Sequence, residues 1–286
     1  MKATKILRRD LEAGRAIVAP GVYDGLSARL VEQAGFKAAY ASGGAIARST
    51  GVPDLGLLSM SEIARRLETI VEVVSIPVIA DADTGYGNAL NAQHAAKAFE
   101  RAGVAGLHIE DQVFPKRCGH YDDKVIISSR EMQQKIRAVR DAISDEDFMV
   151  IGRTDALAVE GFDSAVERAH AYMDAGADMI FVEAPTSIEE IEKLAELLPY
   201  LKLINMFHGG KTPLMSASQL AELGYNLIII PNDTQRAAIF AMMRVLDAID
   251  TEGHSGSLRE QMVSFQDRAK VVRTADYLEL DRRYAV

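Results

Sequence analysis

The segment that contains the only cysteine of the chain has the residue types of a proton-transfer site. Cys118 follows Lys116 and Arg117 and precedes Gly119 and His120. The flanking cations, and His120 when it is protonated, favour the thiolate and lower the cysteine pKa, which is the usual route to a reactive sulfur. An inert structural thiol is the alternative, and chemistry alone leaves both interpretations open.

Acidic residues follow two of the short apolar runs that we interpret as strands. Asp81 and Asp83 are two positions apart, a spacing that points both side chains to the same side of an extended chain, and Glu110 follows the next run. Several acids at one edge repel each other unless a cation lies among them, and all-oxygen ligation favours Mg²⁺ or Mn²⁺ over zinc. An Asp-x-Asp pair alone serves more often in a loop or cap, but beside Glu110 it indicates a metal site.

Glycines and other polar residues also stand where apolar runs end, and we take them as substrate contacts. The glycines expose backbone N–H groups that suit an anionic carboxylate, and the planar fork of Arg153 matches one. An ion pair with Glu183 is the alternative for Arg153. In chain order these candidates are Ser42, Gly43, Gly44, Arg153, Glu183, Asn205 and Pro231.

The histidines outside the cysteine segment carry weaker signals. His94 and His170 lie in helical patterns, where ordinary surface or core histidines are the common case. We interpret His108 as a strand residue out of phase with the rim acids, so we expect it to face the helices.

Short apolar runs alternate with amphipathic stretches along the chain, a pattern typical of repeated βα units with a parallel sheet. Eight units in this length predict an α/β fold, a (β/α)8 TIM-type barrel, with a doubly wound open sheet as the alternative. A barrel places its active site at the carboxyl ends of its strands, where the polar residues stand. The expected strands are 16–19, 38–41, 77–80, 106–109, 148–152, 179–182, 201–204 and 226–230.

Two helical patterns follow the eighth strand, one more than a barrel needs. We expect these extra C-terminal helices at 234–249 and 257–280. We take residues 1–286 as a single barrel domain, whose helical end, 234–286, contributes to oligomer contacts.

Composition narrows the class of protein. The net charge of -9 argues against a nucleic-acid partner or an anionic membrane surface, because such surfaces need clustered Lys and Arg. No apolar run approaches the length that spans a bilayer. One cysteine excludes an intrachain disulfide framework, and the first residues contain no apolar signal region, so we expect a cytoplasmic protein.

Taken in order, these motifs resemble the isocitrate lyase and phosphoenolpyruvate mutase superfamily. Within it the chain is most similar to the short lyases that act on 2-methylisocitrate or 2,3-dimethylmalate. The segments that carry the resemblance are 20–24, 81–87, 110–112, 116–120, 153–156, 182–184 and 209–213.

The resemblance implies a Mg²⁺-dependent carbon–carbon lyase that cleaves a small 2-hydroxy di- or tricarboxylate to a 2-oxo acid and a second carboxylate. Asp83 would bind Mg²⁺ directly, and Cys118 would be the proton donor, with Lys116 and His120 beside it. The base would be Tyr40 or a metal-bound water. The family also implies a homotetramer whose last barrel helix is exchanged between neighbours. The implied water-mediated metal ligands are Asp81, Asp54 and Glu110, and the implied substrate contacts are Ser42, Gly43, Gly44, Arg153, Glu183 and Asn205.

One position departs from the lyase pattern. Close relatives carry an acid before the double glycine, where this chain has His208. A histidine there favours an extra substrate carboxylate or a small substrate.

The alternative functions are a phosphonomutase similar to carboxyphosphonoenolpyruvate phosphonomutase, an oxaloacetate hydrolase or decarboxylase, and a non-catalytic binding barrel. The complete set of Asp81, Asp83, Glu110, Cys118 and Arg153 argues against the last.

Overall fold

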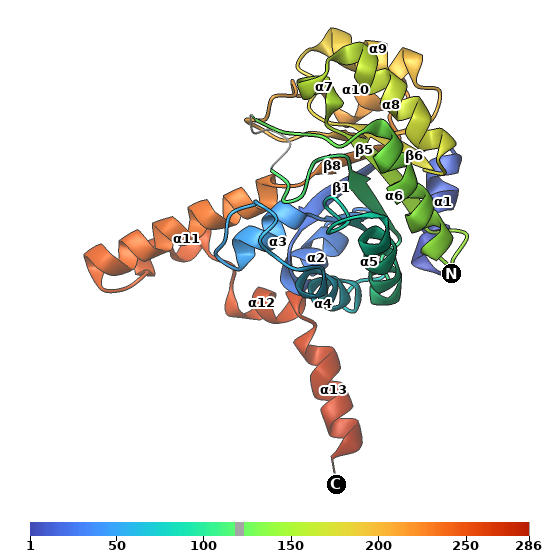
Figure 1. Ribbon diagram of the computed structural model, residues 1–286. Helices are drawn as coiled ribbons and strands as arrows, with labels where there is room; N and C mark the ends of the chain where they lie inside the picture. Colours follow the sequence, from blue (N-terminus) through green and yellow to red (C-terminus); the bar gives the residue numbers. More distant parts are fainter. Residues whose placement is uncertain (118–122, 286) are drawn as a thin grey trace.

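Eight parallel strands pair in chain order and the last pairs with the first, so the sheet closes into a barrel (Figure 1). The computed structural model describes residues 1–117 and 123–285. Closure excludes the doubly wound sheet and confirms the predicted barrel. Each predicted strand overlaps an observed one, and β1 differs most because it continues to Val22. The strands are β1 (Ile17–Val22), β2 (Ala39–Ala41), β3 (Val78–Asp81), β4 (Gly106–Glu110), β5 (Met149–Thr154), β6 (Met179–Val182), β7 (Leu201–Asn205) and β8 (Leu227–Ile230).

The strands are apolar on both sides because each lies between two packed layers. Ile79 and Ile151 belong to the cluster that fills the barrel interior. Their neighbours Val78 and Val150 belong to the layer between the sheet and the helices. This alternation determines which side chains at the strand ends point into the mouth of the barrel.

Capping residues explain where many of the outer helices begin. Ser59, Asn88 and Ser216 each accept a hydrogen bond from the backbone three residues on and form capping boxes. Gly103 ends its helix in the left-handed conformation. The barrel helices are α2 (Gly25–Gln33), α3 (Gly43–Ser49), α4 (Met60–Val71), α5 (Ala89–Ala102), α6 (Ser129–Ala142), α7 (Ala156–Val159), α8 (Phe162–Asp174), α9 (Ile188–Leu197) and α10 (Ala217–Glu222).

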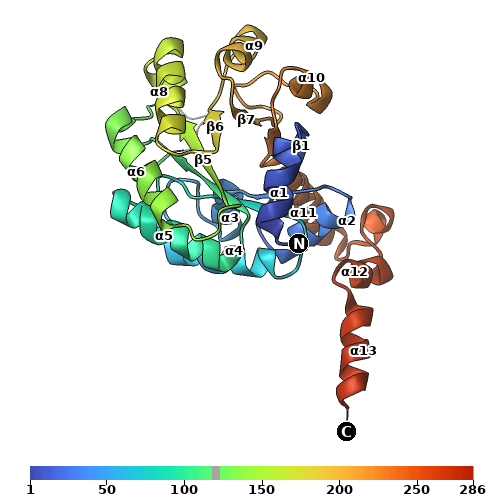
Figure 2. The ribbon, with the colours of Figure 1, turned by 90° about the vertical axis from the view of Figure 1, so that its right-hand side faces the viewer.

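The N-terminal helix α1 (Ala3–Glu12) closes the floor of the barrel, the end where the strands begin (Figure 2). Its Leu7 and Leu11 are each 1% exposed and pack in the interior cluster with Ile17 and Leu227, the first residues of β1 and β8. The opposite end of the barrel is therefore the one open to a ligand.

Of the C-terminal helices, those at 233–252 and 274–284 extend away from the barrel, whereas the one at 265–271 lies beside α2 (Figures 1 and 2). The predicted helix at 234–249 is confirmed as α11 (Asp233–Glu252), but the predicted continuous helix at 257–280 is wrong. Three short helices replace it: η1 (Gly256–Gln261), α12 (Phe265–Val271) and α13 (Thr274–Tyr284). Ser264 starts α12 as its N-cap, and Arg273, with a φ of 56°, separates α12 from α13. No helix in the described part of the chain is both long and apolar enough to cross a membrane.

Candidate active site

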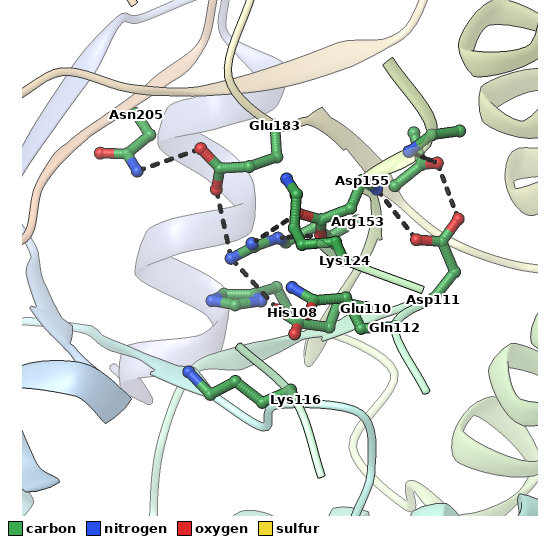
Figure 3. Close-up of polar contacts among 12 residues, drawn as sticks. His108, Glu110, Asp111, Gln112, Lys116, Lys124, Arg153, Asp155, Glu183 and Asn205 are labelled. Atoms are coloured by element: carbon green, nitrogen blue, oxygen red, sulfur yellow. Dashed lines mark hydrogen bonds and ion pairs between the residues drawn. The ribbon is translucent and has the colours of Figure 1, made fainter. Parts of the chain in front are cut away.

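The carboxyl ends of five neighbouring strands bring charged and polar side chains together at the mouth, and Figure 3 shows those of β4 to β7. Asp81 ends β3, Glu110 ends β4, Arg153 lies near the end of β5, Glu183 follows β6 and Asn205 ends β7. All five are buried. The strand-end residues selected from the sequence therefore do converge, as the barrel geometry requires.

Asp81 lies at the centre of a buried polar cluster. Its carboxylate accepts hydrogen bonds from the backbone N–H groups of Gly43 and Asp83, at 3.2 and 3.0 Å, and from the Tyr40 hydroxyl at 3.3 Å. A Cβ on Gly43 would lie 2.8 Å from an Asp81 oxygen, so the glycine is what allows this approach. Burial alone would raise the pKa of Asp81, but His108, Lys116 and Arg153 lower it to about 2.

His108 faces the barrel interior, so the expectation that it faces the helices is wrong. It is two positions before Glu110 on β4, and strand alternation therefore points both side chains to the same side. Its Nε2 lies 2.7 Å from the Tyr40 hydroxyl and 3.4 Å from Asp81, and its ring contacts that of Phe181. Burial lowers the pKa of His108 to about 4, so the imidazole is neutral at pH 7.

The donor set at the mouth fits a divalent cation. Asp81, His108 and Glu110 each place one ligand atom within 4.8 Å of the others. Both carboxylate oxygens of Glu110 are buried and accept no hydrogen bond from residues 1–117 or 123–285. Burial raises the pKa of Glu110 well above its ordinary value, with Asp155 adding to the shift and Arg153 opposing it. An ionised Glu110 therefore needs a further cation, and the oxygen-rich set suits Mg²⁺ better than zinc.

The other two predicted metal acids lie around a lysine. Lys116 Nζ is 2.5 Å from Asp54 and 3.0 Å from Asp83. A Cβ on Gly44 would lie 2.7 Å from an Asp54 oxygen, so this glycine admits Asp54 to the mouth. Burial raises the pKa of Asp83 to about 6, and Asp81 and Asp54 add to the shift while Lys116 opposes it. The four acids thus form two adjoining pairs rather than one shell.

Arg153 is surrounded by carboxylates. Its Nη1 lies 3.2 Å from both Glu110 and Glu183, and its Nε lies 3.0 Å from Asp155. The guanidinium also stands over the ring of Phe181, 5.2 Å from the centroid. The ion pair with Glu183 that was the alternative for Arg153 is present, together with two further ones.

A buried network beside the mouth was not selected from the sequence. Lys124 Nζ lies 2.8 Å from Asp155, whose backbone N–H donates to Asp111 at 2.9 Å. Asp111 also accepts from the hydroxyls of Thr154 and Tyr172, each at 2.7 Å. The polar triplet Arg153-Thr154-Asp155 at the end of a predicted strand could have indicated part of this network. Lys124 lies in a loop without a periodic pattern, so nothing in the sequence indicated its position.

The remaining predicted residues lie at the edge of the mouth or outside the described chain. Cys118 and His120 are outside the described residues. Ser42 is the N-cap of α3, and Asn205 donates to Glu183 at 3.4 Å. His208 is exposed on the loop after β7, and its carbonyl accepts a hydrogen bond from Arg236. Pro231 follows β8.

Comparison with known proteins assigns this barrel and its charged mouth to one superfamily. The family model of phosphoenolpyruvate phosphomutase matches residues 7–250. The chain belongs to the phosphoenolpyruvate mutase and isocitrate lyase superfamily, which confirms the predicted resemblance.

Known members of the superfamily are similar over nearly the whole chain. The 2,3-dimethylmalate lyase of Eubacterium barkeri is 40% identical over 286 residues, covering 100% of this chain and 99% of the relative. The 2-methylisocitrate lyase of Aeropyrum pernix is 43% identical over 276 residues, covering 96% and 89%. A solved phosphonopyruvate hydrolase in complex with oxalate and Mg²⁺ has a TM-score of 0.91 at 32% identity and covers 99% of each chain.

Proposed function

We propose that this protein is a Mg²⁺-dependent carbon–carbon lyase that cleaves a 2-hydroxy di- or tricarboxylate, similar to 2-methylisocitrate or a 2-alkylmalate. The observation that carries the proposal is the buried Glu110 carboxylate, which has no hydrogen-bond donor in the described part of the chain and lies beside Asp81 and Arg153. The lyase names of two relatives at 40% and 43% identity support the reaction class.

Asp81, Asp83 and Glu110 would hold the ion, with Asp54 beside Asp83, and Asp83 would then give up its contact with Lys116. When bound, Mg²⁺ would lower the pKa of a coordinated 2-hydroxyl and anchor the substrate there. Arg153 would bind the substrate carboxylate through its outer guanidinium edge. Ser42, Gly44 and the N-terminus of α3 border the same space, while the Gly43 N–H already donates to Asp81.

In the proposed cleavage the 2-hydroxyl loses its proton and the electron pair of the O–H bond forms the carbonyl of the 2-oxo acid. The C2–C3 bond breaks, and its electrons stay on the departing carbon. Cys118 gives that carbon a proton. Tyr40 can accept the first proton only as a phenolate, and burial together with Asp81 raises the pKa of Tyr40 well above its ordinary value. We therefore propose a water at the mouth as the acceptor and Tyr40 as a donor that holds Asp81.

The substrate screen tests the reaction class. The protein with Mg²⁺ is incubated separately with 2-methylisocitrate, 2,3-dimethylmalate and oxaloacetate, and the 2-oxo acid or oxalate formed is quantified by chromatography. We expect one hydroxy acid to give stoichiometric 2-oxo acid and chelation by EDTA to stop the reaction. Turnover of oxaloacetate alone would make the protein a hydrolase, and no turnover of any substrate would contradict the proposal.

Cys118→Ser tests the proton donor. Because a serine hydroxyl is a much weaker acid than a thiol, we expect turnover to fall by about 10²-fold or more, in line with the loss of general-acid catalysis. Mg²⁺ binding by calorimetry and the melting temperature should stay at wild-type values. Near-normal turnover would remove Cys118 from the mechanism.

We also propose that the protein is a homotetramer in which α11 packs on a neighbouring subunit. The support is a row of exposed apolar side chains on α11, comprising Ile239, Phe240, Met242, Met243, Leu246 and Ile249. Light scattering after size-exclusion chromatography measures the mass. We expect four chains for the wild type and fewer for Leu246→Glu, whereas a monomeric wild type would refute the assembly.

A further inference from the structure

Asp155 is a buried carboxylate beside the mouth that contacts two cationic side chains. It is fully buried, with a side-chain exposure of 0%. Its two oxygens accept from Arg153 Nε at 3.0 Å and Nη2 at 3.2 Å, and from Lys124 Nζ at 2.8 Å. One carboxylate thus contacts both a rim arginine and a lysine from a separate loop.

The two contacts with Arg153 determine how its guanidinium lies. A guanidinium has five N–H donors in one plane, and Asp155 takes one from Nε and one from Nη2, which is a side-on bidentate pair. The ring of Phe181 covers one face of the same plane. The edge that remains is formed by Nη1 and the outer hydrogen of Nη2, and Nη1 is the nitrogen that faces Glu110 and Glu183.

Asp155 is itself held in place from three sides. Its backbone N–H donates to Asp111, whose other oxygen accepts from Thr154 and Tyr172. Lys124, with a side chain 2% exposed, donates to the same Asp155 oxygen as Arg153 Nη2. The carboxylate therefore cannot turn away without breaking buried contacts, and the two cations hold the pKa of Asp155 well below its ordinary value despite its burial.

Arg153 also contacts two other carboxylates, so its guanidinium keeps one orientation only if a further residue holds it. Glu110 and Glu183 both lie 3.2 Å from Nη1. Without Asp155, the guanidinium would be free to turn a bidentate edge toward one of these acids, and that edge would then be unavailable to a ligand.

We propose that Asp155 is a positioning residue, which holds the outer edge of Arg153 toward the substrate carboxylate and keeps the arginine from pairing fully with Glu110 and Glu183. The inference rests on the proposed role of Arg153 in carboxylate binding. Asp155 acts through Arg153 and contacts no substrate atom itself.

Oxalate binding in the presence of Mg²⁺, measured by titration calorimetry, is the test. Asp155→Asn alone would take from the buried Lys124 the carboxylate 2.8 Å from its Nζ, so the test variant is the double substitution Lys124→Met with Asp155→Asn, which removes both charges. Lys124→Met alone is the matched control, because it leaves the bidentate pair of Asp155 with Arg153 intact. We expect the double variant to weaken oxalate binding about 10-fold or more, and the control to change it less than about 3-fold.

A double-mutant cycle with Arg153→Lys separates positioning from general support. If Asp155 acts only through Arg153, the same double substitution in the Arg153→Lys background should weaken oxalate binding no further, whereas a structural role would weaken it equally in both backgrounds. An equal loss in both backgrounds, or no loss in the first, overturns the inference. A loss in Lys124→Met as large as in the double variant would move the role to Lys124. If Arg153→Lys itself leaves oxalate binding unchanged, the proposed carboxylate role of Arg153 is wrong.

Discussion

The two ends of the barrel are built from the same eight strands and hold opposite kinds of side chain. At the floor, Leu7 and Leu11 of α1 pack on apolar side chains at the strand starts. At the mouth, Asp81, Glu110 and Arg153 are also buried but charged or titratable. Apolar burial is favourable wherever it occurs, whereas a buried charge costs free energy unless it has partners.

This difference indicates a division of roles along each strand. Substitutions at the floor should change the free energy of unfolding with little effect on turnover. Substitutions at the mouth should change turnover and metal binding, and some should leave the metal-free protein as stable as before or more stable. Barrels in general separate stability from catalysis in this way.

The largest expected effect is that of Glu110→Gln. The amide keeps the shape of the carboxylate but removes the charge that a divalent cation needs, so we expect turnover to fall by about 10²- to 10³-fold and Mg²⁺ affinity to fall with it. Because the carboxylate accepts no hydrogen bond from the described residues, the metal-free melting temperature should stay within about 2 °C of wild type or rise. A clear fall in that temperature would show that Glu110 supports the fold and would break the comparison.

Leu11→Ala should have the next largest effect, at the other end. Leu11 is 1% exposed, and shortening it leaves a cavity under the interior cluster, so we expect a loss of about 3 kcal/mol in the free energy of unfolding by urea titration. The turnover of the folded protein should match wild type. Leu90→Ala, at a position 74% exposed, is the control and should change the free energy by less than about 0.5 kcal/mol. Reduced turnover in Leu11→Ala would show that the floor and the mouth are coupled.

Lys116→Met sharpens the comparison with a smaller effect. The variant leaves Asp54 and Asp83 to repel each other, and protonation of Asp83, whose pKa is already about 6, relieves part of that repulsion. We expect a loss of about 2 kcal/mol without metal, less than for a fully buried broken pair, and partial recovery with Mg²⁺. Arg117→Gln, with a side chain 52% exposed, is the control and should change stability by less than about 0.5 kcal/mol. A Lys116→Met protein as stable as wild type would show that the pair contributes nothing to the fold.

The barrel itself could be predicted because its signals are local. Each strand is a short apolar run, and closure follows from the number of repeated units. The residues at strand ends, such as Glu110 and Arg153, could be predicted for the same reason, since their place on a strand determines their place on the mouth.

What could not be predicted depends on contacts between distant segments or on one residue's conformation. The approach of Lys124 to Asp155 and of Lys116 to Asp54 is decided by loop packing, which leaves no periodic pattern. The break between α12 and α13 depends on the left-handed backbone of Arg273, a conformation that arginine rarely adopts. For His108 the information was present, and the error was in the strand phase.

Gly21 lies where the first and last strands of the barrel meet, and it should be intolerant of substitution in a mutational scan. A Cβ at this position would lie 2.1 Å from the backbone oxygen of Pro231, and the Gly21 carbonyl accepts a hydrogen bond from Thr234 at 2.9 Å. Every substitution there adds an atom where backbone already stands. In a library selected for growth, position 21 should therefore accept as few substitutions as Glu110 does. An assay of soluble protein yield would separate the two positions, because variants at Gly21 should fail to fold whereas variants at Glu110 should fold without activity.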